Sequence, residues 1–176
     1  MNATQTHIKV YNVSPHEGED FEFDYDVTTS DLLTELVPDL DDWGGIGWME
    51  LEEYEYDPHH QTLHLVLETK SAPPTEWLRN ASLGAHCFEN KLITMAAIRN
   101  DEALVTGSAI RDGVVLQSRR LFEMDPHEIK KYYNDDEPAY DLNKLDNQIW
   151  ESIGQFTSIC TGFYLSEDTA EDCADS

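Results

Sequence analysis

A potential base and a potential nucleophile stand side by side at His86 and Cys87. A thiol is activated when a base lies within hydrogen-bond reach and is itself oriented by a third group. Adjacent residues rarely face each other, and the sequence shows no third group. Ser108 lacks the second glycine that flanks the serine of a nucleophile elbow. We therefore expect no catalytic residues and a protein that is not an enzyme.

Metal ligands are also expected to be absent. Asp57, His59, His60 and His64 match neither an H-x-x-x-H helix nor the Cys/His spacings of zinc sites, so they predict a solvated hairpin turn. The acidic segment DFEFDYDVTTSD has Tyr25 at its sixth position, where the calcium loop of an EF-hand needs glycine. The sequence thus predicts neither a metal site nor a cofactor.

The outlying property of the chain is its charge. The 36 Asp and Glu residues against 11 Lys and Arg give a formal net charge of -25. No lysine or arginine occurs between Lys9 and Lys70, a stretch in which residues 10–69 carry 17 acidic side chains. Such a field repels nucleic acid and anionic membranes and attracts basic partners or cations. We expect a basic protein partner, and no direct contact with nucleic acid or membrane.

The cysteines and the apolar runs bear on the cellular compartment. Cys87, Cys160 and Cys173 are odd in number and in no C-x-x-C arrangement, which favours reduced thiols in a cytoplasm. The N-terminal segment lacks a basic region followed by an apolar one, and no window approaches the about 18 apolar residues of a membrane span. The sequence predicts a cytoplasmic protein.

The elements of the acidic first part follow from apolar periodicity. A strand is predicted at residues 7–13 and a short helix between the N-cap Ser30 and Pro38. Between them, residues 21–27 predict a strand because apolar and acidic positions alternate. Its core face carries Phe21, Phe23, Tyr25 and Val27, and its solvent face carries Glu22, Asp24 and Asp26.

Turn and proline signals place the later elements. Strands at 48–56 and 61–69 predict a hairpin, and Thr75 caps a helix that Gly84 ends. Three strands of an antiparallel meander and two helices are then predicted at residues 91–99, 103–110, 114–122, 125–133 and 141–156. One core between sheet and helices is expected to contain Leu63, Leu65, Leu67, Trp77, Ile93 and Ile98.

The order strand, helix, strand, strand, helix, strand predicts an α+β fold. We expect a ferredoxin-like antiparallel sheet with helices on one face, extra strands and a C-terminal helical extension. Residues 1–124 would form the ferredoxin-like domain, 125–165 the helical extension packed on it, and 166–176 a disordered acidic tail.

The segment LETKSAPPTEWL at residues 67–78 resembles the strand, Pro-Pro, helix signature of the YubB-like proteins of plasmids and phages. The run WGGIGW at 43–48 resembles that family's W-G-x-x-W with one residue more. Gly107 and the turn Asp112-Gly113 fall where the family has a glycine-containing hairpin and a D-G turn. The resemblance implies a ferredoxin-like domain and an origin on a mobile element, and it carries over no catalytic residue.

The carboxylates themselves suggest a function, namely imitation of nucleic-acid phosphates. Alternate side chains on one face of a strand are about 6.6 to 6.8 Å apart, comparable to phosphate spacing along one DNA strand, at most about two base-pair rises of 3.4 Å. Holding like charges together costs stability, so a long stretch without basic residues favours a use for them. The predicted partner-binding residues are Glu17, Asp20, Glu22, Asp24, Asp26, Asp41, Asp42, Glu50, Glu52, Glu53, Glu55 and Asp57.

Three hypotheses follow. In the first, a plasmid- or phage-encoded counter-defence protein mimics DNA and occupies the nucleic-acid-binding surface of a host protein, such as a restriction or CRISPR component. In the second, the chain is an acidic structural or interaction module of a larger assembly, joined through its apolar C-terminal helix. In the third, it is an enzyme whose site is too diffuse to recognise. Carboxylates that serve only solubility, or growth at high salt, are the alternative to any use of the charge.

Overall fold

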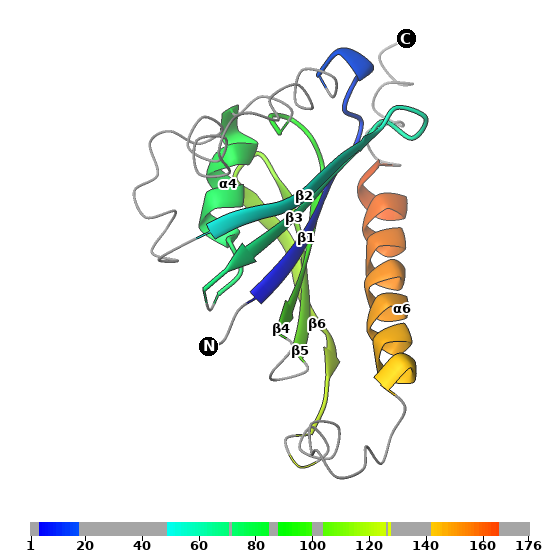
Figure 1. Cartoon of the computed structure of the whole chain (residues 1–176). Coiled ribbons are helices and arrows are strands. Elements are labelled where there is room, and N and C mark those ends of the chain that lie inside the picture. The colour runs from blue at the N-terminus through cyan, green and yellow to red at the C-terminus, as the bar shows by residue number, and fades with distance from the viewer. Residues whose placement is uncertain are drawn as a thin grey trace.

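The computed structural model describes residues 4–17, 49–70, 72–84, 88–99, 104–125, 127 and 142–165. In chain order its elements are β1 (Thr4–Val10), β2 (Met49–Asp57), β3 (Thr62–Thr69), α4 (Thr75–Gly84), β4 (Ile93–Arg99), β5 (Leu104–Arg111), β6 (Val114–Glu123), α6 (Leu142–Cys160) and the π-helical turn η1 (Thr161–Leu165). The six strands form one open antiparallel sheet in the order β2-β3-β1-β4-β5-β6 (Figure 1). Neither of the two helices in these ranges is long and apolar enough to cross a bilayer.

Most predicted elements within the described ranges are confirmed. The mixed α+β class, the β2–β3 hairpin, the helix after the two prolines, the β4–β5–β6 meander and the long C-terminal helix are all present. The first strand ends at Val10, ahead of the predicted end at residue 13. Outside the described residues lie the predicted strand 21–27, the helix after Ser30, most of the helix at 125–133 and the tail at 166–176.

The two helices pack on opposite faces of the sheet (Figure 1). On the α4 face, Trp77 and Leu78 join the apolar side chains of β1, β3 and β4 in one core. On the other face, α6 lies along β4, β5 and β6 and buries a separate core. Its buried stripe is Leu145, Ile149, Ile153 and Phe156, which all lie within the helix predicted at residues 141–156.

One core prediction is wrong. Ile98 does not share a core with Leu65 and Trp77, because it lies on the α6 face beside Ile149. Successive side chains of a strand alternate between faces, and Ile93 and Ile98 are separated by an odd number of positions. Ile93 therefore faces α4 and Ile98 faces α6.

The turn between β5 and β6 is fixed to α4. Asp112 (φ 52°) and Gly113 (φ 78°) both have left-handed backbone, as a two-residue hairpin turn requires. Arg79 Nε donates to the Gly113 carbonyl oxygen (2.9 Å), and the Gly113 N–H donates to Ser82 Oγ (2.8 Å). A Cβ atom at Gly113 would lie 2.7 Å from the Leu83 side chain. The D-G turn and the helix after Pro-Pro therefore hold each other in place.

Close packing also fixes α6 on the sheet. A Cβ atom at Gly107 of β5 would lie 2.8 Å from the ring of Phe156 and 2.9 Å from Leu121. The bare backbone at Gly107 thus lets the aromatic ring approach the sheet directly. Whereas α6 lies over β4, β5 and β6 and contacts β1 through the rings of Trp150 and His7, no described helix lies over the same face of β3 and β2.

Candidate functional site

We call the part of the α6 face made by β2, β3 and β1 the open half-sheet. Across these three strands the sole lysine or arginine is Lys9. The polar side chains of β1 on this side include Gln5, His7 and Lys9, and β3 contributes His64. Six carboxylates share the surface: Glu50, Glu52, Glu53, Glu55 and Asp57 of β2, and Glu68 of β3.

A β-bulge gathers these carboxylates. The register shifts between Leu51 and Glu53, so that Glu52 is an extra residue in the ladder. Before the bulge Glu50 stands opposite Glu68, and after it Glu53, Glu55 and Asp57 stand opposite alternate residues of β3, namely Val66, His64 and Thr62. Alternate residues share a face, and Glu52 joins them because its carboxylate accepts from the Gln5 side chain (3.2 Å). All five acidic side chains of β2 therefore lie on one side.

Crowding by neighbouring carboxylates changes the ionisation of Glu68. A hydrogen bond with Glu52, then burial and repulsion from Glu52 and Glu50, raise the pKa of Glu68. Glu50 and Glu68 are direct cross-strand neighbours, a position where like charges destabilise a sheet. The open half-sheet thus holds its negative charge at a cost in stability.

A chain of hydrogen bonds leads from the carboxylates towards α6. Gln5 Nε2 donates to Glu52, so its Oε1 accepts from His7 Nε2 (3.1 Å). His7 Nδ1 is then the acceptor for the N–H at His64 Nε2 (3.3 Å). The rings of Trp150 and His7 pack edge to face, with ring centroids 4.8 Å apart. This contact joins the open half-sheet to α6.

Both imidazoles are held neutral by their surroundings. Burial and the neighbouring His64 lower the pKa of His7 to about 4. Burial and the positive charge of Lys9 lower the pKa of His64 as well. At neutral pH the two rings therefore act as uncharged hydrogen-bonding groups.

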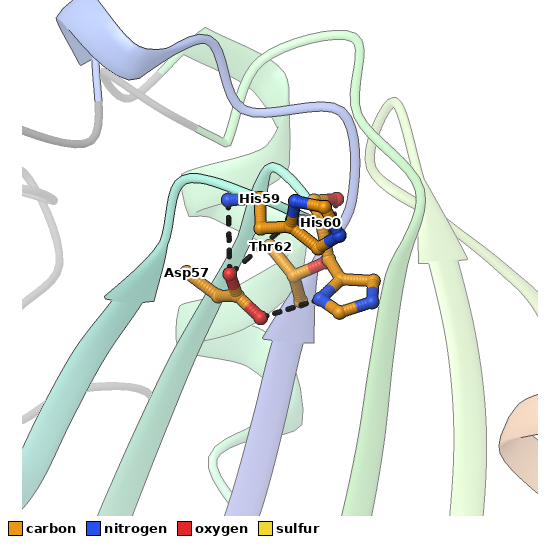
Figure 2. Close-up of polar contacts among 4 residues, drawn as sticks. All are labelled: Asp57, His59, His60 and Thr62. Carbon is orange, nitrogen blue, oxygen red and sulfur yellow. Dashed lines mark hydrogen bonds and ion pairs between the residues drawn. The ribbon is translucent and has the colours of Figure 1, made fainter.

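The turn between β2 and β3 is stabilised by Asp57 at its start (Figure 2). Asp57 Oδ1 accepts from the N–H groups of His59 (3.0 Å) and His60 (3.3 Å), and Oδ2 contacts His60 Nδ1 (2.6 Å). The hydrogen bonds from His60 and His59 lower the pKa of Asp57. The exposed His59 and His60 confirm the predicted solvated turn, whereas His64 lies apart from them, against His7.

The side chains of this surface can bind a partner by charge and hydrogen bonds. Within the described ranges, no hydroxyl or thiol is hydrogen-bonded to His7 or His64, so a base paired with a nucleophile is missing there. Burial raises the pKa of the Cys160 thiol, which disfavours a reactive thiolate. The same ranges contain no group of three His, Cys, Asp or Glu side chains arranged to hold a metal ion.

The structure brings together some of the residues predicted to bind a partner. Five of them are the acidic side chains of β2, which lie together on the open half-sheet and are called the acidic row below. Glu17 lies after β1, where it pairs with Lys91 (3.8 Å). Asp20, Glu22, Asp24, Asp26, Asp41 and Asp42 lie outside the described residues.

Sequence reasoning did not identify Gln5, His7, Glu68 or Trp150 as part of this surface. Gln5 and His7 carry a weak signal, since they alternate with Thr6 and Ile8 along β1. Glu68 and Trp150 join it only through the register of the sheet and the rotation of α6. Comparisons of the chain with protein-family models, with curated proteins and with solved structures gave no match.

Proposed function

We propose that this chain is a non-enzymatic binding protein that mimics DNA and occupies the nucleic-acid-binding surface of a basic host protein, such as a restriction or CRISPR component. The observation that carries the proposal is the gathering of six carboxylates on the open half-sheet by the bulge at Glu52. A DNA-binding surface presents rows of Lys and Arg to phosphates, and a row of carboxylates offers the same partners.

The spacing of the row supports this function. Glu53, Glu55 and Asp57 are alternate residues, so their positions on the strand are about 6.6 to 6.8 Å apart. A rigid sheet holds these charges in register, which a flexible acidic segment cannot do. The unfavourable pairing of Glu50 with Glu68 also favours a use for the charge, because solubility alone does not require like charges to be direct neighbours.

A plasmid or phage origin in the YubB-like group, a ferredoxin-like domain and a cytoplasmic location belong to the same proposal. The strand order β2-β3-β1-β4, with every neighbour antiparallel, is compatible with a split βαβ arrangement. In this order α4 is the crossover between β3 and β4. Plasmids and phages require proteins that block host nucleases, which a DNA mimic would do.

An acidic module of a larger assembly is the second candidate function. It is favoured by large apolar side chains that α6 and η1 leave exposed, namely Trp150 (42%), Ile159 (52%) and Phe163 (60%). Such a module would hold its partner through apolar contacts that salt does not screen.

The test is competition with DNA. The immobilised chain is incubated with a bacterial lysate at low salt, and bound proteins are eluted with duplex DNA. We expect a DNA-binding protein to be retained and then displaced by the DNA. The variant Glu50→Lys/Glu52→Lys/Glu53→Lys should retain none of it, whereas Glu89→Lys/Glu123→Lys/Glu151→Lys, with the same net charge and exposed sites elsewhere, should retain it almost fully. Equal retention by both variants, or retention that DNA cannot displace, would reject the DNA-mimic proposal.

A further inference from the structure

A groove runs between the open half-sheet and α6. Two pockets of about 340 and 400 Å³ adjoin along it, and Lys9, His64 and Thr157 line both. The first pocket lies towards His7 on β1, and the second lies towards Tyr11 beyond the end of that strand. The groove therefore follows the direction of β1.

The first pocket is mainly apolar. Ala96, Ile153 and Phe156 line it together with the indole of Trp150 and the neutral His7 ring. Trp150 is 42% exposed although it is a large aromatic residue, and its ring is held in place against His7. This pocket suits a medium-sized apolar side chain, which loses contact with water on entry.

The second pocket is more polar than the first, and two carboxylates line it. Glu55 and Asp57 line it on the β2 side, and Ser158 of α6 and Thr161 of η1 line it on the opposite side. Asp57 is engaged by the turn, so Glu55 is the carboxylate that an incoming cation would meet. The two pockets thus differ in the chemistry that they accept, apolar at one end and cationic at the other.

We propose that the groove anchors an extended peptide segment of the protein partner, with an apolar side chain in the Trp150 pocket and an arginine or lysine two residues along it beside Glu55. This inference rests on the proposed function, because it gives the basic partner a second point of attachment next to the acidic row. The pockets follow His7, Lys9 and Tyr11 along β1, and side chains two apart in an extended peptide are separated by about 6.6 to 6.8 Å.

Lys9 has a role in this arrangement although it is a cation in an acidic groove. It lies where the two pockets meet, between the positions of the two anchoring side chains. An ammonium group donates hydrogen bonds and accepts none, so it would engage the peptide's backbone carbonyl at that point. In the second pocket, where a cationic side chain is expected, the two negative charges of Glu55 and Asp57 exceed the single positive charge of Lys9.

A glycine of α6 offers a way to fill the first pocket. Gly154 lines it, and a Cβ atom there would meet nothing within 4 Å. The variant Gly154→Leu therefore places a side chain in the pocket without disturbing the helix, in which leucine is favoured over glycine. Gly162→Leu is the matched control, because Gly162 is equally unobstructed and lines neither pocket.

The probe is the acetylated and amidated peptide Ala-Leu-Ser-Arg-Ala, titrated into the full chain while the Trp150 indole N–H resonance is followed by NMR. We expect saturable shifts with the full chain and with Gly162→Leu, and affinity at least about tenfold weaker with Gly154→Leu, because the leucine of the peptide then stays in water. Replacing the leucine of the peptide with glycine, or its arginine with glutamate, should weaken binding similarly.

The outcomes separate this inference from the function on which it rests. If Gly154→Leu and Gly162→Leu bind the peptide equally, or if the glutamate peptide binds as well as the arginine peptide, the groove is not the anchor. The DNA-mimic proposal then still stands or falls on the two triple variants. If those triple variants retain lysate proteins equally while Gly154→Leu alone blocks the peptide, the DNA-mimic proposal is the one that fails.

Discussion

The α6 face of the sheet has two halves that share an antiparallel backbone but differ in burial, polarity and charge. Under α6, β4 presents Thr94, Ala96 and Ile98, all buried, and the helix covers them with an apolar stripe. On β2, β3 and β1, the same face presents six carboxylates and the pair His7 and His64. The strand sequences differ accordingly, since β4 is apolar at nearly every position and β2 alternates.

This difference shows that one sheet can separate its stabilising part from its charged part. Burial under α6 removes apolar surface from water, which is the main favourable contribution to folding. The strands of the open half-sheet pack most of their apolar side chains on the other face, towards α4, while the carboxylates of the open half-sheet repel each other. If the comparison is right, substitutions in the two halves should affect stability very differently.

The largest expected effect is in the covered half. Phe156→Ala removes a ring that is 3% exposed and packs on Gly107, and it should lower the free energy of unfolding by about 3 to 5 kcal/mol. Glu53→Ala in the open half should change the same quantity by no more than about 0.5 kcal/mol. Urea denaturation of both variants measures the contrast. Comparable losses would show that the open half-sheet is also a packed surface.

A smaller effect concerns His7 and acid. The pKa of His7 is lowered from its ordinary 6.5 to about 4 in the folded chain. At a pH between these two values, the His7 ring therefore binds a proton more readily in the unfolded chain than in the folded chain. The stability linked to His7 is therefore complete above about pH 6.5 and is lost as pH falls towards about 4. After discounting for solvent screening of the half-buried ring, the loss is on the order of 1 to 2 kcal/mol.

The variant His7→Gln isolates this effect. Unfolding free energies of the two proteins are compared at about pH 7 and about pH 4.5. We expect the unsubstituted chain to lose more stability than His7→Gln over this interval, since the carboxylates titrate in both proteins and cancel in the difference. Parallel losses would mean that the His7 ring is protonated without cost in the fold.

The smallest expected effect has the opposite sign. Glu68→Gln removes a carboxylate that faces Glu50 and Glu52, so it should raise the free energy of unfolding at neutral pH by about 0.2 to 1 kcal/mol. The raised pKa of Glu68 means that the folded chain takes up this proton more readily than the unfolded chain, so the repulsion is relieved as pH falls. The gain should accordingly shrink in acid. Glu89→Gln, at an exposed turn, should show no gain at either pH.

Periodicity predicted the hairpin, the meander and α6, because each has a face that must leave water. The sequence could also have predicted that Ile93 and Ile98 lie on opposite faces of the sheet, because they are an odd number of positions apart on one strand. The sequence could not have predicted that the four glutamates of β2 share one face, since strict alternation places Glu50 and Glu53 on opposite faces. The bulge that unites them depends on pairing with β3, and no glycine or proline in β2 signals it. The groove beside Trp150 depends similarly on how α6 is rotated over the sheet.

The bulge at Glu52 also determines how the chain tolerates changes in length. Without Glu52, the residues from Met49 to Asp57 alternate regularly, with Met49, Leu51, Tyr54 and Tyr56 facing the α4 core. Glu52 is thus an extra residue that disturbs the ladder only locally. Its deletion should leave all the remaining side chains of β2 on their present faces. Deletion of Glu55, which lies on the regular part of the strand, would instead reverse the faces of all residues on one side of the gap. This strand can therefore lose one acidic residue at this position without losing its fold.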